Sequence, residues 1–139
     1  MRKAVLLNSD ITRVVSEMGH GNALCIGDAG LPVPDGVERI DLAVSRGLPS
    51  FMDTLSAVTA ELFVERVLIA TEMVDQQPGF HKQVVEWIEK LALTQGNQIE
   101  IQTVAHESFK VETETARAVV RTGECTPYAN IILYSGVSF

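Results

Sequence analysis

The sequence predicts an α/β fold: one compact domain over residues 1–139, in which a mixed sheet is flanked by helices. Short apolar runs that are typical of strands alternate with segments whose apolar residues recur at helical spacing. The 139 residues, with a mass of 15.2 kDa, are the size of a single domain. No repeat, low-complexity tract or linker divides the chain.

The first helix is predicted over residues 9–18. Its apolar residues recur at i, i+3, i+4 and i+7, which puts them on one face: Ile11, Val14, Val15 and Met18. Ser9 or Asp10 can cap its start, and Gly19 suits a left-handed stop. We therefore expect His20 to lie just past a helix end.

A short buried strand is predicted at residues 23–26, and a turn-rich segment follows at 27–32. Asp28 then lies at the carboxyl end of a strand, where open α/β folds tend to bind ligands. Residues 37–44 indicate, more weakly, another extended piece.

A second helix is predicted to begin at Pro49-Ser50. Ser50 and Asp53, three residues apart, form a weak version of the capping box. Residues 67–70 are rich in β-branched side chains and predict a central strand.

A longer helix is predicted to begin at Pro78 and to end at Gly96. Its buried face is marked by Val84, Val85, Ile88 and Leu91. Residues 99–102 alternate between apolar and polar, as a half-exposed strand would.

The last part of the chain predicts a helix over 106–116, a short strand over 118–120 and a final strand over 131–134. A polar loop over 123–130 separates the two strands. The apolar residue Phe139 suggests an end that packs within the fold or against a neighbouring subunit.

The charge of the chain argues against two classes of partner. Lys and Arg number 11 against 18 Asp and Glu, for a formal charge of −7. That average field repels nucleic-acid phosphates and anionic membrane surfaces, so we expect neither partner. No apolar run approaches the roughly 20 residues of a membrane span.

Residues 1–7 are basic and then apolar, but the apolar stretch is shorter than the roughly 7–15 residues of the apolar region in a secretory signal peptide. We expect a cytoplasmic protein. Cys25 and Cys125 form no C-x-x-C pair, and Cys25, in an apolar run, predicts a small buried thiol.

His20 and His106 each follow a structural boundary, where functional groups collect. From spacing alone, both are better interpreted as polar residues that satisfy turn backbones. No metal-binding spacing is present, and a scattered metal site built from His20, Asp28 and His106 is disfavoured. We expect no metal and no cofactor.

Tyr128 and Asn130 lie in the polar loop before the last strand. A tyrosine near Pro and Asn usually serves packing and turns. A sugar site also uses aromatic edges, amides and carboxylates, because these groups match hydroxyl donors and acceptors. Asp28 fits the same inventory.

Eight stretches together resemble the D-ribose pyranase (ribose mutarotase) family, whose broader group includes fucose mutarotases. In chain order they are LNSDI (7–11), GH (19–20), DAGLPVP (28–34), RID (39–41), GLPSF (47–51), QGN (95–97), HE (106–107) and RTGECTPYANIIL (121–133). Each motif is weak alone, but their order over nearly the whole chain makes a strong signal.

The resemblance implies an α/β subunit in a ring-shaped homodecamer of two stacked pentameric rings, with sites at subunit boundaries. It implies conversion between β-D-ribopyranose and β-D-ribofuranose, ahead of phosphorylation by ribokinase. The proton donor of the family falls on His20. The sugar-binding positions fall on Asp28, His106, Lys110, Tyr128, Ala129 and Asn130.

Ring opening of a hemiacetal needs one proton delivered to the ring oxygen and another removed from the anomeric hydroxyl. An imidazole, with an unperturbed pKa of about 6.5, suits that exchange. Asp28 would orient or polarise His20, or hold a sugar hydroxyl. Two alternatives remain open: a mutarotase for fucose or another monosaccharide, and a non-catalytic sugar-binding protein.

Overall fold

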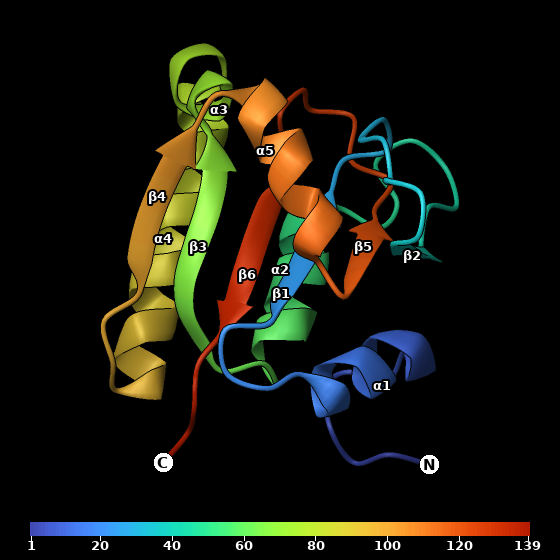
Figure 1. Ribbon diagram of the computed structural model, residues 1–139, viewed down its shortest axis with the longest axis vertical. Coiled ribbons are helices and arrows are strands. Elements are labelled where there is room, and N and C mark those ends of the chain that lie inside the picture. The colour runs from blue at the N-terminus through green and yellow to red at the C-terminus, as the bar shows by residue number, and fades with distance from the viewer.

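The computed structural model describes all residues 1–139, and its centre is a six-stranded mixed sheet (Figure 1). Across the sheet, the strands lie in the order β2-β5-β1-β6-β3-β4. Their bounds are β1 Ala23–Gly27, β2 Glu38–Asp41, β3 Val64–Ala70, β4 Glu100–Val104, β5 Ala118–Arg121 and β6 Ile131–Ser135. The predicted α/β fold with a mixed sheet is confirmed.

Strand β6 is the one strand that runs against its neighbours. It pairs antiparallel with β1 and β3, whereas β1 with β5, β2 with β5, and β3 with β4 are parallel pairs. Five strands therefore end at one edge of the sheet, where β6 begins; we name this the carboxyl edge. At the opposite edge, the amino edge, the five strands begin and β6 ends.

The helices cover the two faces of the sheet unequally. Their bounds are α1 Ser9–Glu17, α2 Phe51–Thr59, α3 Thr71–Gln76, α4 Pro78–Gln95 and α5 His106–Glu112, followed by a 3-10 turn at Thr113–Thr115. Residues of α1, α2 and α4 share one buried cluster with the sheet, and α5 packs on the other side (Figure 1).

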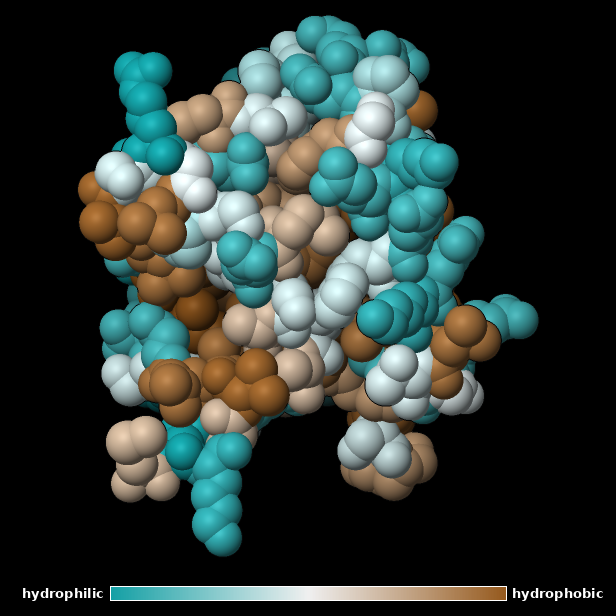
Figure 2. All heavy atoms as spheres, turned by 180° about the vertical axis from the view of Figure 1, so that it is seen from behind, coloured by the Kyte–Doolittle hydropathy of each residue, from teal (hydrophilic) through white to brown (hydrophobic).

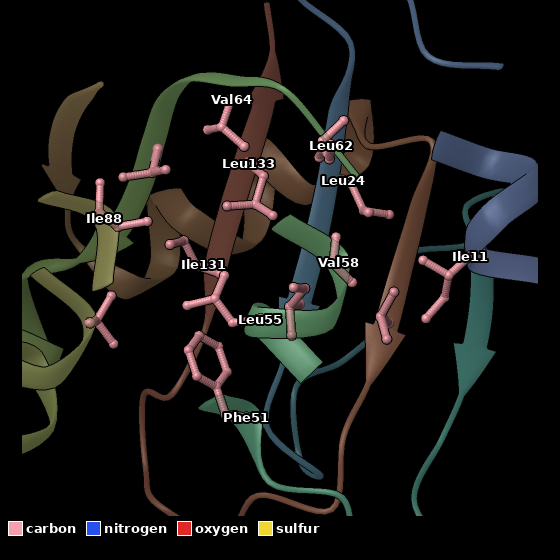
Figure 3. Close-up of a cluster of buried hydrophobic side chains, with 14 of the residues drawn as sticks. Ile11, Leu24, Phe51, Leu55, Val58, Leu62, Val64, Ile88, Ile131 and Leu133 are labelled. Carbon is pink, nitrogen blue, oxygen red and sulfur yellow. The ribbon is translucent and has the colours of Figure 1, made fainter. Parts of the chain in front are cut away.

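The larger of two apolar clusters lies between the sheet and α1, α2 and α4. In Figure 3, Phe51, Leu55 and Val58 of α2 point toward the β6 residues Ile131 and Leu133. All five side chains are fully buried. Burying each such side chain is worth about 1.5–3 kcal/mol, so this layer holds α2 and β6 in place.

Cys25 belongs to the smaller cluster under α5, together with Phe109 and Ile132. It is fully buried and unbonded, as predicted. Burial raises the pKa of its thiol, and the negative charge of Asp28 adds to that effect.

The ends of α1 differ from the prediction. Its cap is Asn8, whose side-chain oxygen accepts from the N–H of Ile11 at 2.9 Å, and neither Ser9 nor Asp10 serves. The chain leaves the helix through Met18 in an extended conformation, so the predicted left-handed stop at Gly19 is also wrong. Three adjacent residues can each cap a helix, and sequence alone does not choose among them.

Two other helix signals are confirmed, whereas the helix predicted over 106–116 ends at Glu112 and is followed by a 3-10 turn, and Val85 is only half-buried. Ser50 caps α2 by accepting from the N–H of Asp53 at 3.1 Å. Gly96 ends α4 in the left-handed conformation, with φ 76°. The predicted strand at 67–70 begins earlier, at Val64, and α3 was not predicted because its six residues are too few to show a period.

None of these helices combines the length and the apolar character needed to cross a membrane.

Candidate functional site

Asp28 and Asn130 form the centre of a polar site at the carboxyl edge. Asp28 follows β1, and Asn130 precedes the adjacent β6. The side-chain oxygen of Asn130 accepts from the Asp28 N–H at 2.8 Å, and its amide nitrogen donates to Asp28 Oδ2 at 3.1 Å. Oδ1 of Asp28 accepts from the Gly30 N–H at 2.9 Å. These bonds hold the Asp28 carboxylate in one orientation.

Tyr128 and His106 add two rings beside this pair. Their ring centroids lie 5.1 Å apart at an interplanar angle of 80°. The Tyr128 carbonyl accepts from the Asn130 N–H at 2.8 Å, which ties the tyrosine to the Asp28–Asn130 pair. Tyr128 has a φ of 64°, which is uncommon for a residue with a side chain and is found often at functional sites.

His106 is held by its backbone while one of its ring nitrogens remains unbonded. Its N–H donates to Oε2 of Glu72 at 2.8 Å, at the start of α5. Its Nδ1 is buried and has no hydrogen-bond partner. An unsatisfied buried polar atom costs about 1–3 kcal/mol, and such costs are tolerated at functional sites.

Lys110 lies four residues after His106 on α5, and therefore on the same side of that helix. Its ammonium group is 2.8 Å from Oε1 of Glu107, and this contact holds the pKa of the Glu107 carboxyl below its usual range. Lys110 also lines a shallow groove of about 290 Å³ with Pro32 and Val33. Ala129 is fully buried between Tyr128 and Asn130, so its side chain does not face solvent.

A cavity of about 600 Å³ opens beside Asp28. Its polar and charged lining includes Arg46, Arg121, Glu124 and Thr126. Arg121 pairs with Asp41 at 3.0 Å. Neither arginine is among the predicted site residues, although Arg121 stands at the end of a strand within a recognised motif and could have been selected on that ground.

Glu124 ties the polar loop before β6 to the start of α2. Its Oε2 accepts from the Phe51 N–H at 3.2 Å, and its Oε1 accepts from the Thr126 hydroxyl at 2.9 Å and N–H at 3.2 Å. Burial alone would raise the pKa of this carboxyl, but these hydrogen bonds outweigh it and the pKa is lowered. The loop that carries Tyr128 is thus fixed to the body of the fold.

His20 lies at the amino edge, away from the other predicted site residues. His20 precedes β1, and Asp28 follows β1. The five residues of this strand, roughly 16 Å of chain, therefore lie between the two side chains. The structure thus gathers Asp28, His106, Tyr128, Ala129 and Asn130, with Lys110 one turn along α5, but it does not bring His20 to them within one chain.

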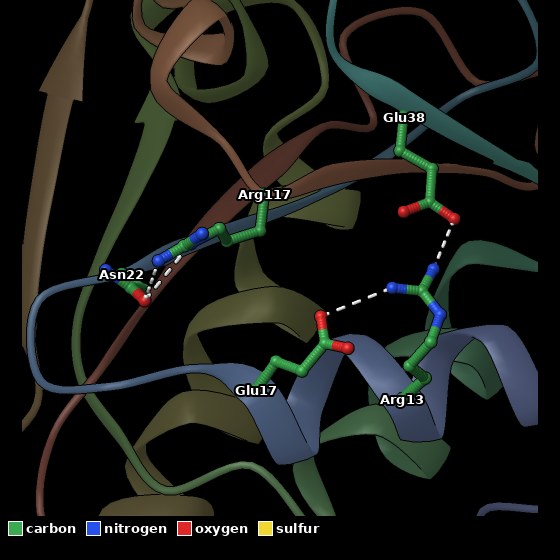
Figure 4. A network of polar contacts seen from close by, with 5 residues as sticks. All are labelled: Arg13, Glu17, Asn22, Glu38 and Arg117. Carbon is green, nitrogen blue, oxygen red and sulfur yellow. Dashed lines mark hydrogen bonds and ion pairs between the residues drawn. The ribbon is translucent and has the colours of Figure 1, made fainter.

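The turn that carries His20 is anchored on both sides. Asn22 Oδ1 accepts from the Gly19 N–H at 3.0 Å and from Nε and Nη2 of Arg117 at 3.2 and 3.0 Å (Figure 4). The N–H of Gly21 donates to the Ser135 carbonyl at 2.7 Å. On the ring itself, Nε2 lies 2.9 Å from Oε2 of Glu65.

The chemistry available at the carboxyl edge suits a polyhydroxylated ligand. A carboxylate, a phenol, an imidazole and an ammonium group supply both donors and acceptors for hydroxyls. No three His, Cys, Asp or Glu side chains lie close enough together to hold a metal ion. The cavity beside Asp28 offers room for a small ligand, but Asp28 is the only predicted site residue that lines it.

Three comparisons with known proteins agree with one another. The sequence matches the RbsD / FucU transport protein family over residues 1–138. It is similar to proteins named D-ribose pyranase from Edwardsiella ictaluri (50% identical) and Actinobacillus pleuropneumoniae serotype 7 (52%), each over the full length of both chains. The fold is similar to the structure of Bacillus subtilis RbsD complexed with D-ribose, with a TM-score of 0.88, 43% identity and full coverage of both chains.

Proposed function

This chain belongs to the RbsD / FucU transport protein family, and from that premise we propose that it is an isomerase that interconverts β-D-ribopyranose and β-D-ribofuranose. The observation that carries the proposal is its identity of about half of all residues, over the full length, with proteins named D-ribose pyranase. Its product would be the substrate of ribokinase in the cytoplasm. The whole chain, residues 1–139, would act as one mutarotase domain.

The sugar would bind at the carboxyl edge. Asp28, fixed by Asn130, would accept hydrogen bonds from hydroxyls, and the rings of Tyr128 and His106 would contact the sugar. Lys110 would donate to a hydroxyl from α5, and Ala129 would contribute its backbone. Nδ1 of His106 is buried and unbonded, so it would meet a ligand only if the ring turned on binding.

The catalysis that the reaction requires is proton transfer. Opening of the pyranose breaks the bond between C1 and the ring oxygen, which gains a proton while the anomeric hydroxyl loses one. Closure through another hydroxyl reverses both transfers and gives the furanose. His20 would deliver and recover the proton, a role that typically contributes on the order of 10²–10⁴-fold. No redox change occurs, so the reaction calls for no redox cofactor.

His20 would act on a sugar held by a neighbouring copy of the chain. Its exposed side chain lies at the amino edge, whereas the proposed sugar residues lie at the carboxyl edge. A ring of subunits that sets the amino edge of one copy against the carboxyl edge of the next would complete the site. The homodecamer of two stacked pentameric rings is part of this proposal.

Exposed apolar side chains support self-association. Seen from behind, hydrophobic residues gather on the left of the molecule (Figure 2). The exposed large side chains include Val5, Leu7, Val44 and Leu48. An apolar groove of about 220 Å³, lined in part by Leu6 and Leu42, adds to this surface. Exposed apolar area of this kind marks interaction sites.

Exchange between the ring forms of ribose tests the function directly. In saturation-transfer NMR, catalytic amounts of the protein should speed exchange between pyranose and furanose signals. His20→Ala should lower the enzyme-catalysed rate by roughly 10²–10⁴-fold while ribose still binds. His81→Ala, which removes a histidine of α4, should leave the rate unchanged. Ribose exchange that the wild-type protein does not alter would refute the function.

A further inference from the structure

Glu65 holds the His20 imidazole from within the same chain. Oε1 and Oε2 of Glu65 lie 3.1 and 2.9 Å from Nε2 of His20. Nδ1 of the ring makes no hydrogen bond in the chain. A carboxylate only accepts hydrogen bonds, so this contact requires the proton of a neutral ring to be on Nε2 and leaves Nδ1 free.

A β-bulge brings Glu65 to this position. Val64 pairs with Ser135, and Arg66 pairs with Tyr134, the adjacent residue of β6. Glu65 is therefore an extra residue of β3 that has no partner on β6. Bulges re-aim side chains and are common beside active sites. The direction in which Glu65 points is therefore set by the pairing of β3 with β6.

Gly136 confines the Glu65 side chain from the other side. The Gly136 N–H donates to the Phe63 carbonyl at 3.0 Å, which keeps the end of β6 against the start of β3. A Cβ at Gly136 would lie 3.1 Å from Cβ and 3.3 Å from Oε2 of Glu65. The absence of a side chain there leaves the space that Glu65 needs to reach His20.

The backbone next to His20 and the backbone next to Glu65 both contact Ser135, at the end of β6. The Gly21 N–H donates to Ser135, and Ser135 pairs with Val64. An exposed ion pair contributes little to stability. The fixed contact between Glu65 and His20 is therefore better explained as a way to orient the His20 ring.

We propose that Glu65 is a positioning residue that holds Nε2–H of His20, so that His20 exchanges the sugar proton through Nδ1. The inference rests on the proposed proton role of His20. In ring opening, Nδ1–H of the imidazolium gives its proton to the ring oxygen as the bond to C1 breaks, and the anomeric hydroxyl gives its proton to water. The neutral ring keeps its other proton on Nε2, against Glu65. Closure reverses both transfers through a different hydroxyl.

The tautomer of His20 provides the first test. With ¹⁵N-labelled histidine at pH 8.5, where ordinary imidazoles are neutral, the nitrogen shifts report which atom carries the proton. We expect Nε2–H alone in the wild type and a mixture of tautomers in Glu65→Ala. A wild-type ring protonated mainly on Nδ1 would overturn the inference.

Kinetics provide the second test. Glu65→Ala should lower kcat for ribose exchange by roughly 10–100-fold, the range typical for loss of a partner that orients a metal-bound imidazole, and should leave ribose affinity unchanged. In a His20→Ala background, the same substitution should have no further effect, because Glu65 acts only through His20. Glu86→Ala, which removes an exposed carboxylate of α4 paired with Lys82, is the control and should retain full kcat.

Full activity of Glu65→Ala, or equal further losses in the two backgrounds, would contradict the positioning role. If His20→Ala itself retains full activity, the proposed proton role fails instead. Gly136→Ala keeps every charge but crowds Glu65, and it should lower kcat in the same direction. Wild-type kcat in that variant, with Glu65 displaced, would also count against the role.

Discussion

At the scale of single residues, the site depends on how Asn130 holds Asp28. Asn130 is fully buried and bonds both the backbone and the carboxylate of Asp28. Its amide is the group that fits there, since it accepts from the N–H with one atom and donates to the carboxylate with the other. A second carboxylate would satisfy only the first of these bonds.

Asn130→Asp should therefore abolish ribose binding and lower the free energy of unfolding by roughly 2–4 kcal/mol at neutral pH, because it buries a like charge against Asp28. Chemical denaturation at fixed protein concentration, with ribose titration, measures both effects. Asn8→Asp is the matched control. Aspartate caps a helix as well as asparagine, so stability should not fall there. Equal stability of the two variants would show that the Asp28 contact is unimportant.

The residue types of the site could be predicted from the sequence, but the edge of the sheet at which each residue lies could not. Asp28 was correctly placed at a strand end by the pattern of an apolar run followed by a turn. The position of Glu65 beside His20 could not be predicted, because a bulge is a property of two paired strands and the sequence of β3 alone does not reveal it. The separation of His20 from Asp28 follows from the direction of β1, once both residues are seen to flank it.

At the scale of elements, the polar loop before β6 and the start of α2 stabilise each other through Glu124. The carboxylate accepts the Phe51 N–H, one of the donors that a helix leaves unpaired at its first turn. The Ser50 hydroxyl accepts from a second of these donors, the N–H of Asp53. The loop that carries Tyr128 is therefore fixed by a helix cap.

Glu124 makes stability depend on pH. Its pKa is lower in the fold than the ordinary value of 4.5, so its contribution is complete above that value and is lost as the pH falls through the folded pKa. Glu124→Gln should lower the free energy of unfolding by about 1 kcal/mol at pH 7, and the difference from wild type should shrink toward pH 3. Glu86→Gln, at an exposed ion pair, should differ little at either pH. A Glu124→Gln deficit that grows as the pH falls would contradict this account.

Elements with long periodic patterns could be predicted from sequence, and elements set by tertiary pairing could not. The Gly96 end of α4 and three of the four residues predicted for its buried face, Val84, Ile88 and Leu91, are correct, since eighteen residues give several turns of pattern. The six residues of α3 show no period, and the start of β3 at Val64 depends on pairing with Ser135. The place of β6 between β1 and β3 is likewise a long-range property.

At the scale of the whole molecule, the fold places the proposed proton donor and the proposed sugar-binding residues at opposite edges of one sheet. Every strand except β6 points from the amino edge, with His20 and Glu65, to the carboxyl edge, with Asp28, Tyr128 and Asn130. Under the proposed function, one chain carries half of each of two sites. That proposal makes assembly of copies a requirement for activity, and we expect dilution to monomers to abolish it.

The most direct test of this division is complementation between two inactive variants. His20→Ala and Asp28→Asn should each be inactive alone in ribose exchange. Refolded together in equal amounts, they should recover about a quarter of wild-type activity, because random assembly gives one site in four an intact His20 from one copy and an intact Asp28 from another. Mixed assemblies that form but remain inactive would contradict the account, since a site contained within one chain cannot be restored by mixing.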